Sequence, residues 1–264
     1  MSPDPDKPTT DRLQSLTRGL TVLKSFSRQH TTMSVSEVAK RSNLSRATAR
    51  RILLTLEELG YVRSEYSRYS LRPKVLELGY AYLSSLYPWD SALPVMQAFS
   101  AEIDENCLAG VLDGVDVVCV ARTARKIVPV FVSVGGRLPA YASSMGRVLL
   151  AFQAPDELEI YLQQIDIRPM TQQAITSLDD LRAELGRVRA QGWSMVENEV
   201  APDLVGLAVP IYGPGGQVAA ALNVSIHQHG YGSAQRLVAV RERLLVCSRE
   251  LSLLFAGSTS SIMV

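Results

Sequence analysis

The hydrophobic positions between residues 34 and 61 recur at the spacing of two amphipathic helices separated by a short polar break. Ser34 and Glu37 stand in the S-x-x-E relation of a capping box, so the first helix is expected to begin there. Asn43 tolerates the left-handed conformation of a tight turn, and Ser45 can cap the second helix. The second helix then presents one apolar face, formed by Ala49, Ile52, Leu53, Leu56 and Leu59.

The start of the second helix is basic on the side away from this apolar face. Residues there are expected to meet base edges and phosphates in a DNA groove; they are Ser45, Arg46, Ala47, Arg50 and Arg51. The stretch 61–72, YVRSEYSRYSLR, has the aromatic and β-branched character of a short hairpin and adds Arg63 and Arg68. Helical hairpins with a basic outer face also occur in proteins that do not bind DNA. Two helices followed by a basic hairpin nevertheless favour a winged helix-turn-helix that binds double-stranded DNA.

Helical periodicity also flanks this region. Residues 12–27 are expected to form a first helix, so the DNA-binding domain spans 12–72, whereas the polar, proline-rich residues 1–11 are expected to be a disordered tail. Pro73 favours a helix start, and the apolar run after it predicts a linker helix over 73–87. This helix has more apolar residues than one small domain covers. It is therefore either a dimer contact or an intramolecular packing face.

From residue 88 to 258 the pattern alternates between strand and helix lengths. Asp113-Gly114 is a strong hairpin signal between two apolar runs. Strands are expected at 107–111, 115–121, 128–134, 193–197, 207–211 and 218–226. Helices are expected for about a dozen residues from Val95 and at 143–152, 155–165, 178–191 and 233–255. The result is an α+β domain with an antiparallel sheet.

Composition changes this picture in two ways. The 264 residues suffice for two domains, and residues 1–72 hold 13 Lys and Arg against 7 Asp and Glu, whereas the rest holds 14 against 19. Only the N-terminal domain is therefore expected to meet a polyanion. Residues 204–226 lack ionised side chains, but Pro210 and the turn at 213–216 divide them into two strand lengths, so a buried hairpin is expected and not a membrane span.

The cysteines and the N-terminus bear on the compartment. The chain has an odd number of cysteines, which lie far apart and form no C-x-x-C motif: Cys107, Cys119 and Cys247. This argues against a disulfide framework or a zinc ribbon. No signal peptide opens the chain. A cytoplasmic protein is expected.

Catalytic motifs are missing from the sequence. It has no G-x-x-x-x-G-K, G-x-G-x-x-G or G-x-S-x-G. Ser144 and Arg147 imitate an S-x-x-K pair, but arginine is too basic to act as a general base. His227 and His229 need a third metal ligand, and none is evident. We therefore expect neither an enzyme nor a cofactor; an enzyme with a DNA-binding head is the rival interpretation, which turnover of a small acid by pure protein would support.

Two polar groups in the second domain are candidates for ligand binding. Ser143 and Ser144 lie where a helix begins, and a helix N-terminus favours a carboxylate. Asn223 and Ser225 share one face of an expected buried strand, so their side chains need hydrogen-bond partners. These partners are either structural or part of an anionic small ligand.

Four segments resemble IclR-type transcription regulators, and the resemblance covers nearly the whole chain: QSLTRGLTVLKSF, LSRATARRILLTLEELGYV, LPAYASSMGRVLLA and VAAALNVSIH. The segments RATARR, VLELGYAYLSS and SVGGRLPAYASSMGRVLLA are especially similar to regulators of protocatechuate and p-hydroxybenzoate catabolism in the β-ketoadipate pathway. The resemblance implies a winged helix joined by a linker helix to a GAF-like effector domain. It also implies a homodimer, or a tetramer formed by two dimers, on a palindromic operator.

The resemblance implies a set of effector-binding residues: Leu138, Ser144, Met145, Glu199, Leu207, Val209, Asn223 and Ser225. The chain departs from the subfamily pattern G-L-R-S-I-A-V-P at 203–210, because Val205 replaces a possible cationic partner for a carboxylate. The expected function is a ligand-responsive activator of an aromatic-acid catabolic operon that senses a small organic acid. The alternative is an IclR-type repressor that responds to a different small carboxylate.

Overall fold

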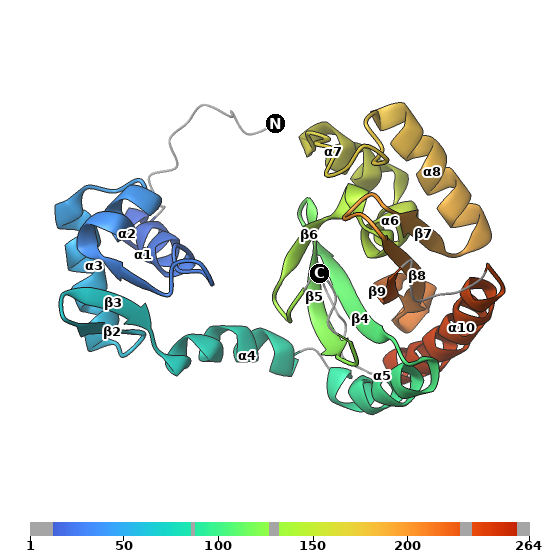
Figure 1. Cartoon of the computed structure of the whole chain (residues 1–264), viewed down its shortest axis with the longest axis horizontal. Coiled ribbons are helices and arrows are strands. Elements are labelled where there is room, and N and C mark those ends of the chain that lie inside the picture. Colours follow the sequence, from blue (N-terminus) through green and yellow to red (C-terminus); the bar gives the residue numbers. More distant parts are fainter. Residues whose placement is uncertain (1–12, 86–87, 127–131, 228–233, 258–264) are drawn as a thin grey trace. The chain divides into compact units, whose positions relative to one another are not determined.

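The computed structural model describes residues 13–85, 88–126, 132–227 and 234–257 (Figure 1). The chain divides into an N-terminal unit up to Tyr82 and a C-terminal unit from Leu83. The tail expected at 1–11 lies outside the described residues.

The N-terminal unit is a helix-turn-helix with a small antiparallel sheet, in the order β1-β3-β2. Its elements are α1 (Gln14–Lys24), β1 (Thr32–Ser34), α2 (Val35–Arg41), α3 (Arg46–Glu58), β2 (Val62–Glu65) and β3 (Arg68–Leu71). The expected winged helix is thus confirmed, with β1 as an additional strand. One expectation was wrong: Leu59 lies at the C-cap of α3 and is 53% exposed, although Ala49, Leu53 and Leu56 of the same face are buried.

Local hydrogen bonds set the ends of the two helices. The Ser34 hydroxyl accepts from the Glu37 amide at 3.3 Å, and the Glu37 carboxylate accepts from the Ser34 amide at 2.7 Å, so the capping box is complete. Asn43 adopts a φ of 52°, as the turn requires. Ser45 then caps α3 by accepting from the Thr48 amide at 3.1 Å.

The hairpin that forms the wing turns through Tyr66 and Ser67, whose φ angles are 49° and 63°. Positive φ at both central residues matches the twist of a two-residue hairpin, and it leaves Tyr66 fully exposed. After the wing, the turn Pro73–Val75 leads into α4 (Leu76–Ser85), as the proline predicted. The last two residues of the expected linker helix, 86 and 87, lie outside the described residues.

A six-stranded antiparallel sheet organises the C-terminal unit, in the order β6-β5-β4-β9-β8-β7 (Figure 1). Its strands are β4 (Asn106–Asp113), β5 (Asp116–Thr123), β6 (Arg137–Pro139), β7 (Ser194–Glu197), β8 (Leu204–Tyr212) and β9 (Val218–His227). Its helices are α5 (Trp89–Ile103), α6 (Ser144–Ala151), α7 (Pro155–Gln164), α8 (Leu178–Gln191) and α10 (Ala234–Ala256).

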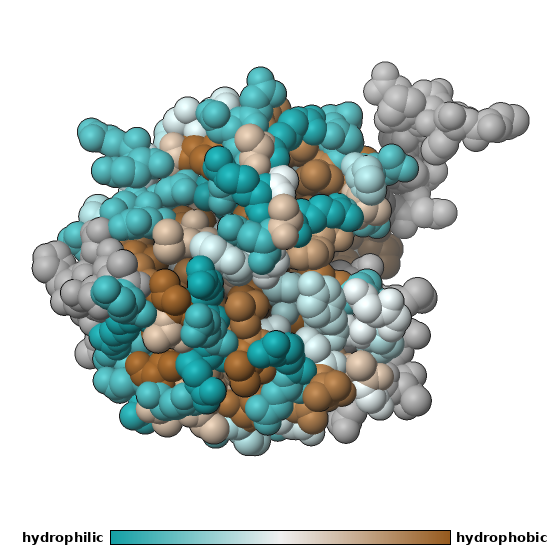
Figure 2. Space-filling view, turned by 90° about the vertical axis from the view of Figure 1, so that its right-hand side faces the viewer, coloured by the Kyte–Doolittle hydropathy of each residue, from teal (hydrophilic) through white to brown (hydrophobic). Residues whose placement is uncertain are grey.

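Helices cover both faces of this sheet. On one face α5 and α10 pack over a core that includes Leu207, Leu222 and Leu251, which we call the α10-side core. On the other face α6 and α8, with α7, pack over a core that includes Leu108 and Leu185, the α6-side core. The expected α+β domain with an antiparallel sheet is confirmed. On the surface that carries α8 and α10, apolar side chains occur in small groups separated by hydrophilic ones (Figure 2).

One expected element of this unit was placed wrongly, and another lies largely outside the described residues. The helix expected from Val95 begins at Trp89 and contains Pro94. Trp89 packs edge-on against Phe255 with ring centroids 5.0 Å apart, and this burial offsets the hydrogen bond that the proline cannot make. Of the strand expected at 128–134, residues 128–131 lie outside the described residues and 132–134 form no strand. Instead the short strand β6 pairs with β5.

The uncharged stretch 204–226 forms the expected buried hairpin. β8 and β9 pair antiparallel along their length, from Leu204 opposite His227 to Tyr212 opposite Val218. Within the described ranges, no helix is both long and apolar enough to cross a bilayer.

Candidate effector pocket and DNA-binding surface

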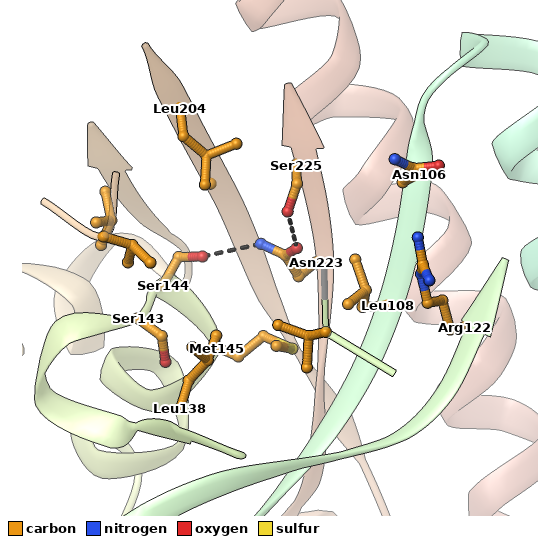
Figure 3. A pocket seen from close by; sticks show the side chains of 14 residues that line it. Asn106, Leu108, Arg122, Leu138, Ser143, Ser144, Met145, Leu204, Asn223 and Ser225 are labelled. Atoms are coloured by element: carbon orange, nitrogen blue, oxygen red, sulfur yellow. Dashed lines mark hydrogen bonds between the residues drawn. The ribbon is translucent and has the colours of Figure 1, made fainter. Parts of the chain in front are cut away.

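A cavity lies between the start of α6 and the face of the sheet that α6 covers (Figure 3). Its volume is about 50 Å³. Strands β4, β5, β8 and β9 form its floor, and the segments around β6 and before β8 close its sides. It is lined by Asn106, Leu108, Arg122, Val132, Leu138, Ser143, Ser144, Met145, Val196, Val200, Leu204, Gly206, Asn223 and Ser225.

Close backbone packing holds the start of α6 at this cavity. Ser143 caps the helix by accepting from the Gly146 amide at 3.0 Å. A Cβ on Gly146 would come within 2.1 Å of the Ala140 carbonyl oxygen, so only glycine lets α6 approach the preceding turn. The Tyr161 hydroxyl accepts from the Tyr141 amide at 3.0 Å and secures the same turn. Burial raises the pKa of Tyr161, so this hydroxyl stays neutral.

Three polar side chains form a hydrogen-bonded row across the cavity (Figure 3). The Asn223 amide nitrogen donates to Ser144 Oγ at 2.9 Å and to the Leu207 carbonyl oxygen at 3.0 Å. The Asn223 amide oxygen accepts from Ser225 Oγ at 2.9 Å. The polar pair expected on β9 and the serine expected at the helix start are therefore in direct contact. Leu138 and Met145, also expected at the site, line the same cavity.

Eight residues that line the cavity were missed by sequence reasoning, and three of them bear on its chemistry or shape; the other five are Leu108, Val132, Val196, Val200 and Leu204. Arg122, on β5, adds a cationic side chain to the lining of the cavity. The sequence feature that could have indicated it is an ionised residue at the end of an apolar strand. Asn106 lines the cavity and accepts from the Arg125 and Lys126 amides at 2.7 and 2.9 Å. Gly206 lies opposite Ser225 on β8. A Cβ at Gly206 would lie 2.8 Å from Ser144 Oγ, so the floor needs a glycine there.

Two residues expected at the site lie on the face of the sheet opposite the cavity. Leu207 and Val209 point into the α10-side core, whereas Gly206 faces the cavity. Side chains alternate between the faces of a strand, so an error of one residue in the alignment of β8 moves a side chain to the opposite face. Leu207 contributes only its backbone carbonyl. Val205, which replaces the possible cationic partner, is fully buried and also alternates with Gly206, so it faces away from the cavity.

Glu199 does not line the cavity either. Its carboxylate forms a bidentate ion pair with Arg147 of α6, at 2.8 and 2.6 Å, and accepts from the Ile175 amide at 3.0 Å. The Arg147 side chain is 2% exposed. This buried pair ties α6 to the loop before β8, whose Val200 does line the cavity. Glu199 therefore supports the cavity from behind and is not available to a ligand in this structure.

The histidine pair and the pair Ser144 and Arg147 were the metal-binding and catalytic candidates of the sequence. Within the described ranges, no group of three or more His, Cys, Asp or Glu residues is close enough to hold a metal ion. His229 lies outside the described residues, so the expected pair with His227 is not described. Arg147, which stands at the lysine position of an S-x-x-K pattern, forms the ion pair with Glu199.

The expected DNA-binding residues lie on the surface of the N-terminal unit. Ser45, Arg46, Ala47, Arg50 and Arg51 are all exposed, and no ion pair engages the three arginines within the described part of the chain. The three arginine side chains do not lie on the same side of α3, because Arg51 borders a groove between α1 and α3.

The two arginines of the wing are exposed but partly engaged. Arg63 donates to Ser70 Oγ at 3.2 Å and pairs with Glu65 at 3.4 Å. Arg68 donates to the Thr32 carbonyl at 2.8 Å and pairs with Glu37 at 3.4 Å. Arg68 thus connects the wing to β1 and to the cap of α2.

Comparison with protein families matches both units. The model of the IclR helix-turn-helix domain matches residues 15–65. The model described as bacterial transcriptional regulator IclR C-terminal matches residues 80–253. The chain is 42% identical over 219 residues to the Pca regulon regulatory protein of Pseudomonas putida, covering 82% of this chain and 75% of that protein. It is 30% identical over 221 residues to the p-hydroxybenzoate hydroxylase transcriptional activator of Acinetobacter baylyi, covering 81% and 82%.

Solved structures share the fold over most of the chain. A transcriptional regulator from Rhodococcus sp. RHA1 has a TM-score of 0.83 and 41% identity, covering 93% of this chain and 99% of that one. An IclR homolog from Microbacterium hydrocarbonoxydans, solved in complex with 4-hydroxybenzoate, has a TM-score of 0.81 and 24% identity, covering 92% and 100%. The matched families and relatives are transcription regulators and not enzymes. A winged helix with exposed arginines and a second unit with a cavity lined by apolar and polar side chains therefore belong to one chain, and that chain is a member of the IclR family of bacterial transcriptional regulators.

Proposed function

We propose that the protein activates the transcription of aromatic-acid catabolic genes when a small organic acid binds in the cavity at the start of α6. The observation that carries this proposal is the cavity itself, in which Arg122 and the row Ser144, Asn223 and Ser225, with Asn106 and Ser143, provide polar groups among apolar side chains. A few fixed polar groups within an apolar wall are typical of small-molecule sites. The relatives that are named for Pca and p-hydroxybenzoate regulation support the choice of aromatic acids.

The ligand carboxylate has two sources of positive potential in this cavity. The first is the N-terminus of α6, where Ser143 and Ser144 line the cavity. The second is the Arg122 guanidinium on β5. A charge-assisted bond to a guanidinium is worth about 1.5–3 kcal/mol, so Arg122 is the stronger single anchor for an acid.

An aromatic ring needs more room than the cavity offers in this structure. Its volume is about 50 Å³, whereas an engineered cavity that takes up benzene has about 150 Å³. Lining side chains therefore move when a ring enters. Met145 is the residue best suited to move, because its side chain is unbranched and adapts easily. Met145 belongs to α6, so ring binding acts directly on this helix.

DNA binding is assigned to the exposed start of α3. Arg46 and Arg50 lie one helical turn apart and off the buried face of α3, where a recognition helix contacts base edges and phosphates. Replacing Arg50 by Ala should weaken operator binding and reduce the salt dependence by about 0.9 log unit for each phosphate that the protein no longer neutralises. Arg51 borders the groove on the α1 side, so Arg51→Ala is the matched control and should have the smaller effect. If both substitutions weaken operator binding equally, the assignment of the DNA contacts to the side of α3 that carries Arg46 and Arg50 is wrong.

Self-association is assigned to α4 and the adjoining groove. Leu76, Leu78, Tyr80 and Tyr82 are 74%, 51%, 71% and 45% exposed, and apolar residues of α1 and α3 border a groove beside Leu78. Exposed apolar surface of this kind marks a protein interface. A second copy of the chain is the partner we propose, because a two-fold dimer places two winged helices on the half-sites of a palindromic operator.

A thermal-shift titration with 4-hydroxybenzoate, 3,4-dihydroxybenzoate, benzoate and adipate tests the effector assignment. A ligand at 100 times its dissociation constant stabilises the folded protein by about 2.7 kcal/mol. Arg122→Gln should weaken binding of the best acid at least tenfold. Arg125→Gln is the control, because that side chain is exposed and pairs with Asp104 outside the cavity. The assignment is wrong if none of the four acids raises the melting temperature.

The sign of regulation needs a separate experiment. A reporter gene behind the operator should be expressed more strongly when the effector and the protein are both present than when either is missing. Expression that rises when the protein is deleted would make it a repressor.

A further inference from the structure

The turn at the tip of the wing has an unusual backbone for its residue types. Tyr66 and Ser67 connect β2 to β3 and have φ angles of 49° and 63°. A two-residue turn of this kind needs positive φ at both positions, and asparagine followed by glycine adopts it most easily. A bulky residue such as tyrosine seldom takes up this conformation. The chain therefore holds two strained residues where a relaxed pair would form the same hairpin.

Hydrogen bonds on both strands of the wing hold this turn in place. On β2, the amide and the hydroxyl group of Ser64 donate to the Glu57 carboxylate of α3 at 3.0 and 2.7 Å. On β3, Arg68 donates to the Thr32 carbonyl oxygen at 2.8 Å and pairs with Glu37 at 3.4 Å. Strained backbone persists where the surrounding structure fixes it, and it is frequent at functional sites. The tip of the wing is thus held in a defined position relative to α3.

The side chain at this tip is not used by the fold. Tyr66 is fully exposed, and within the described part of the chain no hydrogen bond or ion pair engages its hydroxyl group. The other tyrosine of the hairpin, Tyr69, is 7% exposed and belongs to the core of the N-terminal unit. Packing inside the unit therefore offsets nothing of the strain at Tyr66, and a contact outside the chain is the remaining reason to hold a large side chain there.

The surroundings of Tyr66 favour a polyanion as this outside partner. Residues 62–72 contain three arginines and one glutamate, and the glutamate, Glu65, pairs with Arg63. Arg63 and Arg68 are both exposed, on the two strands that lead to the tip. Tyrosine is among the residues that bond phosphate and sugar oxygens of DNA, because its phenol group has an O–H to donate.

We propose that Tyr66 contacts the DNA backbone, and that its phenol hydroxyl group donates a hydrogen bond to a phosphate oxygen beside the bases that α3 contacts. Glu57 and Arg68 are the positioning residues that fix the tip for this contact. The inference rests on the proposed function, because it requires that the start of α3 binds DNA. It adds an uncharged contact to those of the arginines.

An uncharged donor responds to salt differently from an arginine. Each phosphate that a cation neutralises releases counterions, so the affinity falls with salt by about 0.9 log unit per contact. A phenol hydroxyl group neutralises no charge. Its removal should therefore weaken DNA binding by the same factor at every salt concentration, and the factor for one hydrogen bond is roughly 3- to 10-fold.

The test uses the full-length protein and a fluorescent DNA duplex that this protein has selected from a random pool. Tyr66→Phe keeps the ring and removes the O–H, so it should weaken binding roughly 3- to 10-fold and leave the salt slope unchanged. Arg50→Ala is the comparison, because it should reduce the slope. A duplex of scrambled sequence should show the same loss for Tyr66→Phe, since its phosphates are the same.

Two substitutions that relax the turn provide a second readout. Asparagine and glycine both tolerate positive φ, so Tyr66→Asn and Ser67→Gly should each raise the melting temperature. Only Tyr66→Asn should weaken DNA binding, because Ser67→Gly keeps the phenol. If the turn had a purely structural role, both variants would gain stability and bind DNA as the unmodified protein does. An equal loss of affinity in Ser67→Gly would mean that affinity follows the stiffness of the turn, and it would also overturn the inference.

The same measurements separate this inference from the proposed function. If Tyr66→Phe binds as tightly as the unmodified protein while Arg50→Ala binds more weakly, the inference is overturned and the proposed function stands. If neither variant binds more weakly, the assignment of DNA binding to α3 is overturned as well. A loss confined to the selected duplex would place the phenol on a base edge and overturn the backbone contact. A changed molar mass of Tyr66→Asn in light scattering would place the tyrosine between two chains and overturn its contact with DNA.

Discussion

At the residue scale, Arg147 and Glu199 show how a charged pair serves a cavity without lining it. Both charges are largely removed from water, and each depends on the other for compensation. Arg147 also donates to the Tyr141 carbonyl at 2.9 Å, so the pair connects α6, the turn before it and the loop that carries Val200. The charges therefore position three walls of the cavity at once.

Removing one member of this pair should be strongly destabilising. Glu199→Ala leaves the Arg147 guanidinium buried without a counter-charge, and the expected loss is about 3–5 kcal/mol in the free energy of unfolding. The double variant Arg147→Met with Glu199→Leu removes both charges and should recover most of this loss. Urea unfolding of the three proteins measures the effect. A single variant as stable as the unmodified protein would mean that Glu199 is free for a ligand, as the sequence alone had indicated.

The buried thiols predict how stability depends on pH. Burial raises the pKa of Cys119 to about 11 and that of Cys247 to about 12, from an ordinary value of 9.0. A group whose pKa is raised by folding stabilises the folded state fully below pH 9, and this contribution is lost as the pH rises towards 11 and 12. Each pKa unit corresponds to about 1.4 kcal/mol.

The urea midpoint should therefore fall between pH 8 and pH 10.5. Cys119→Ala should show a smaller fall than the unmodified protein over the same interval, because one thiol no longer ionises on unfolding. An identical fall in both proteins would exclude a contribution from Cys119.

At the element scale, the start of α3 has one side-chain cap. Ser45 Oγ accepts from the Thr48 amide and lies 2.9 Å from Thr48 Oγ1. Ser45 is also exposed at the proposed DNA surface, so its two roles need to be separated. Ser45→Ala should cost about 0.5–2 kcal/mol of stability through loss of the cap.

Two substitutions that retain the cap separate these roles. Ser45→Asn should keep the stability and leave DNA affinity nearly unchanged. Ser45→Asp should also keep the stability but weaken operator binding, because its charge faces the phosphates. Chemical denaturation and a fluorescence titration with operator DNA at one salt concentration measure both quantities. If Ser45→Asp binds the operator as tightly as the unmodified protein, the start of α3 lies away from the phosphates.

At the scale of the whole molecule, the proposed self-association depends on the exposed apolar side chains of α4. Leu76 and Tyr80 lie one turn apart on α4 and are 74% and 71% exposed. The double substitution to Glu should convert the proposed dimer to a monomer, seen by light scattering, and should weaken operator binding because one winged helix covers only one half-site. Leu253→Glu on α10 is the matched control, since Leu253 is 75% exposed in the other unit. A dimer that survives the α4 substitutions would assign self-association to another surface.

The sequence alone determined those features that depend on neighbours in the chain. The capping box of Ser34 and Glu37, the left-handed Asn43 and the stop of α8 at Gly192 follow from side-chain or backbone preferences within a few residues. The winged helix and the antiparallel sheet followed from the order of such signals. The serine at the start of α6 and the polar pair on β9 were also named together as candidates, and their side chains are in contact in the structure.

The tertiary structure decided what depends on distant residues. Side-chain alternation along β8 does not show which face meets α6, so Leu207 and Gly206 were distinguished only by the packing of that helix against the sheet. From the sequence, Glu199 was a reasonable ligand contact. Only the structure shows that its carboxylate pairs with Arg147, which lies 52 residues earlier in the chain. Arg122 reached the cavity through the pairing of β5 with β4. Short-range preferences are encoded in adjacent residues, but a site is formed by contacts between segments whose register and facing are set by the packing of the whole core.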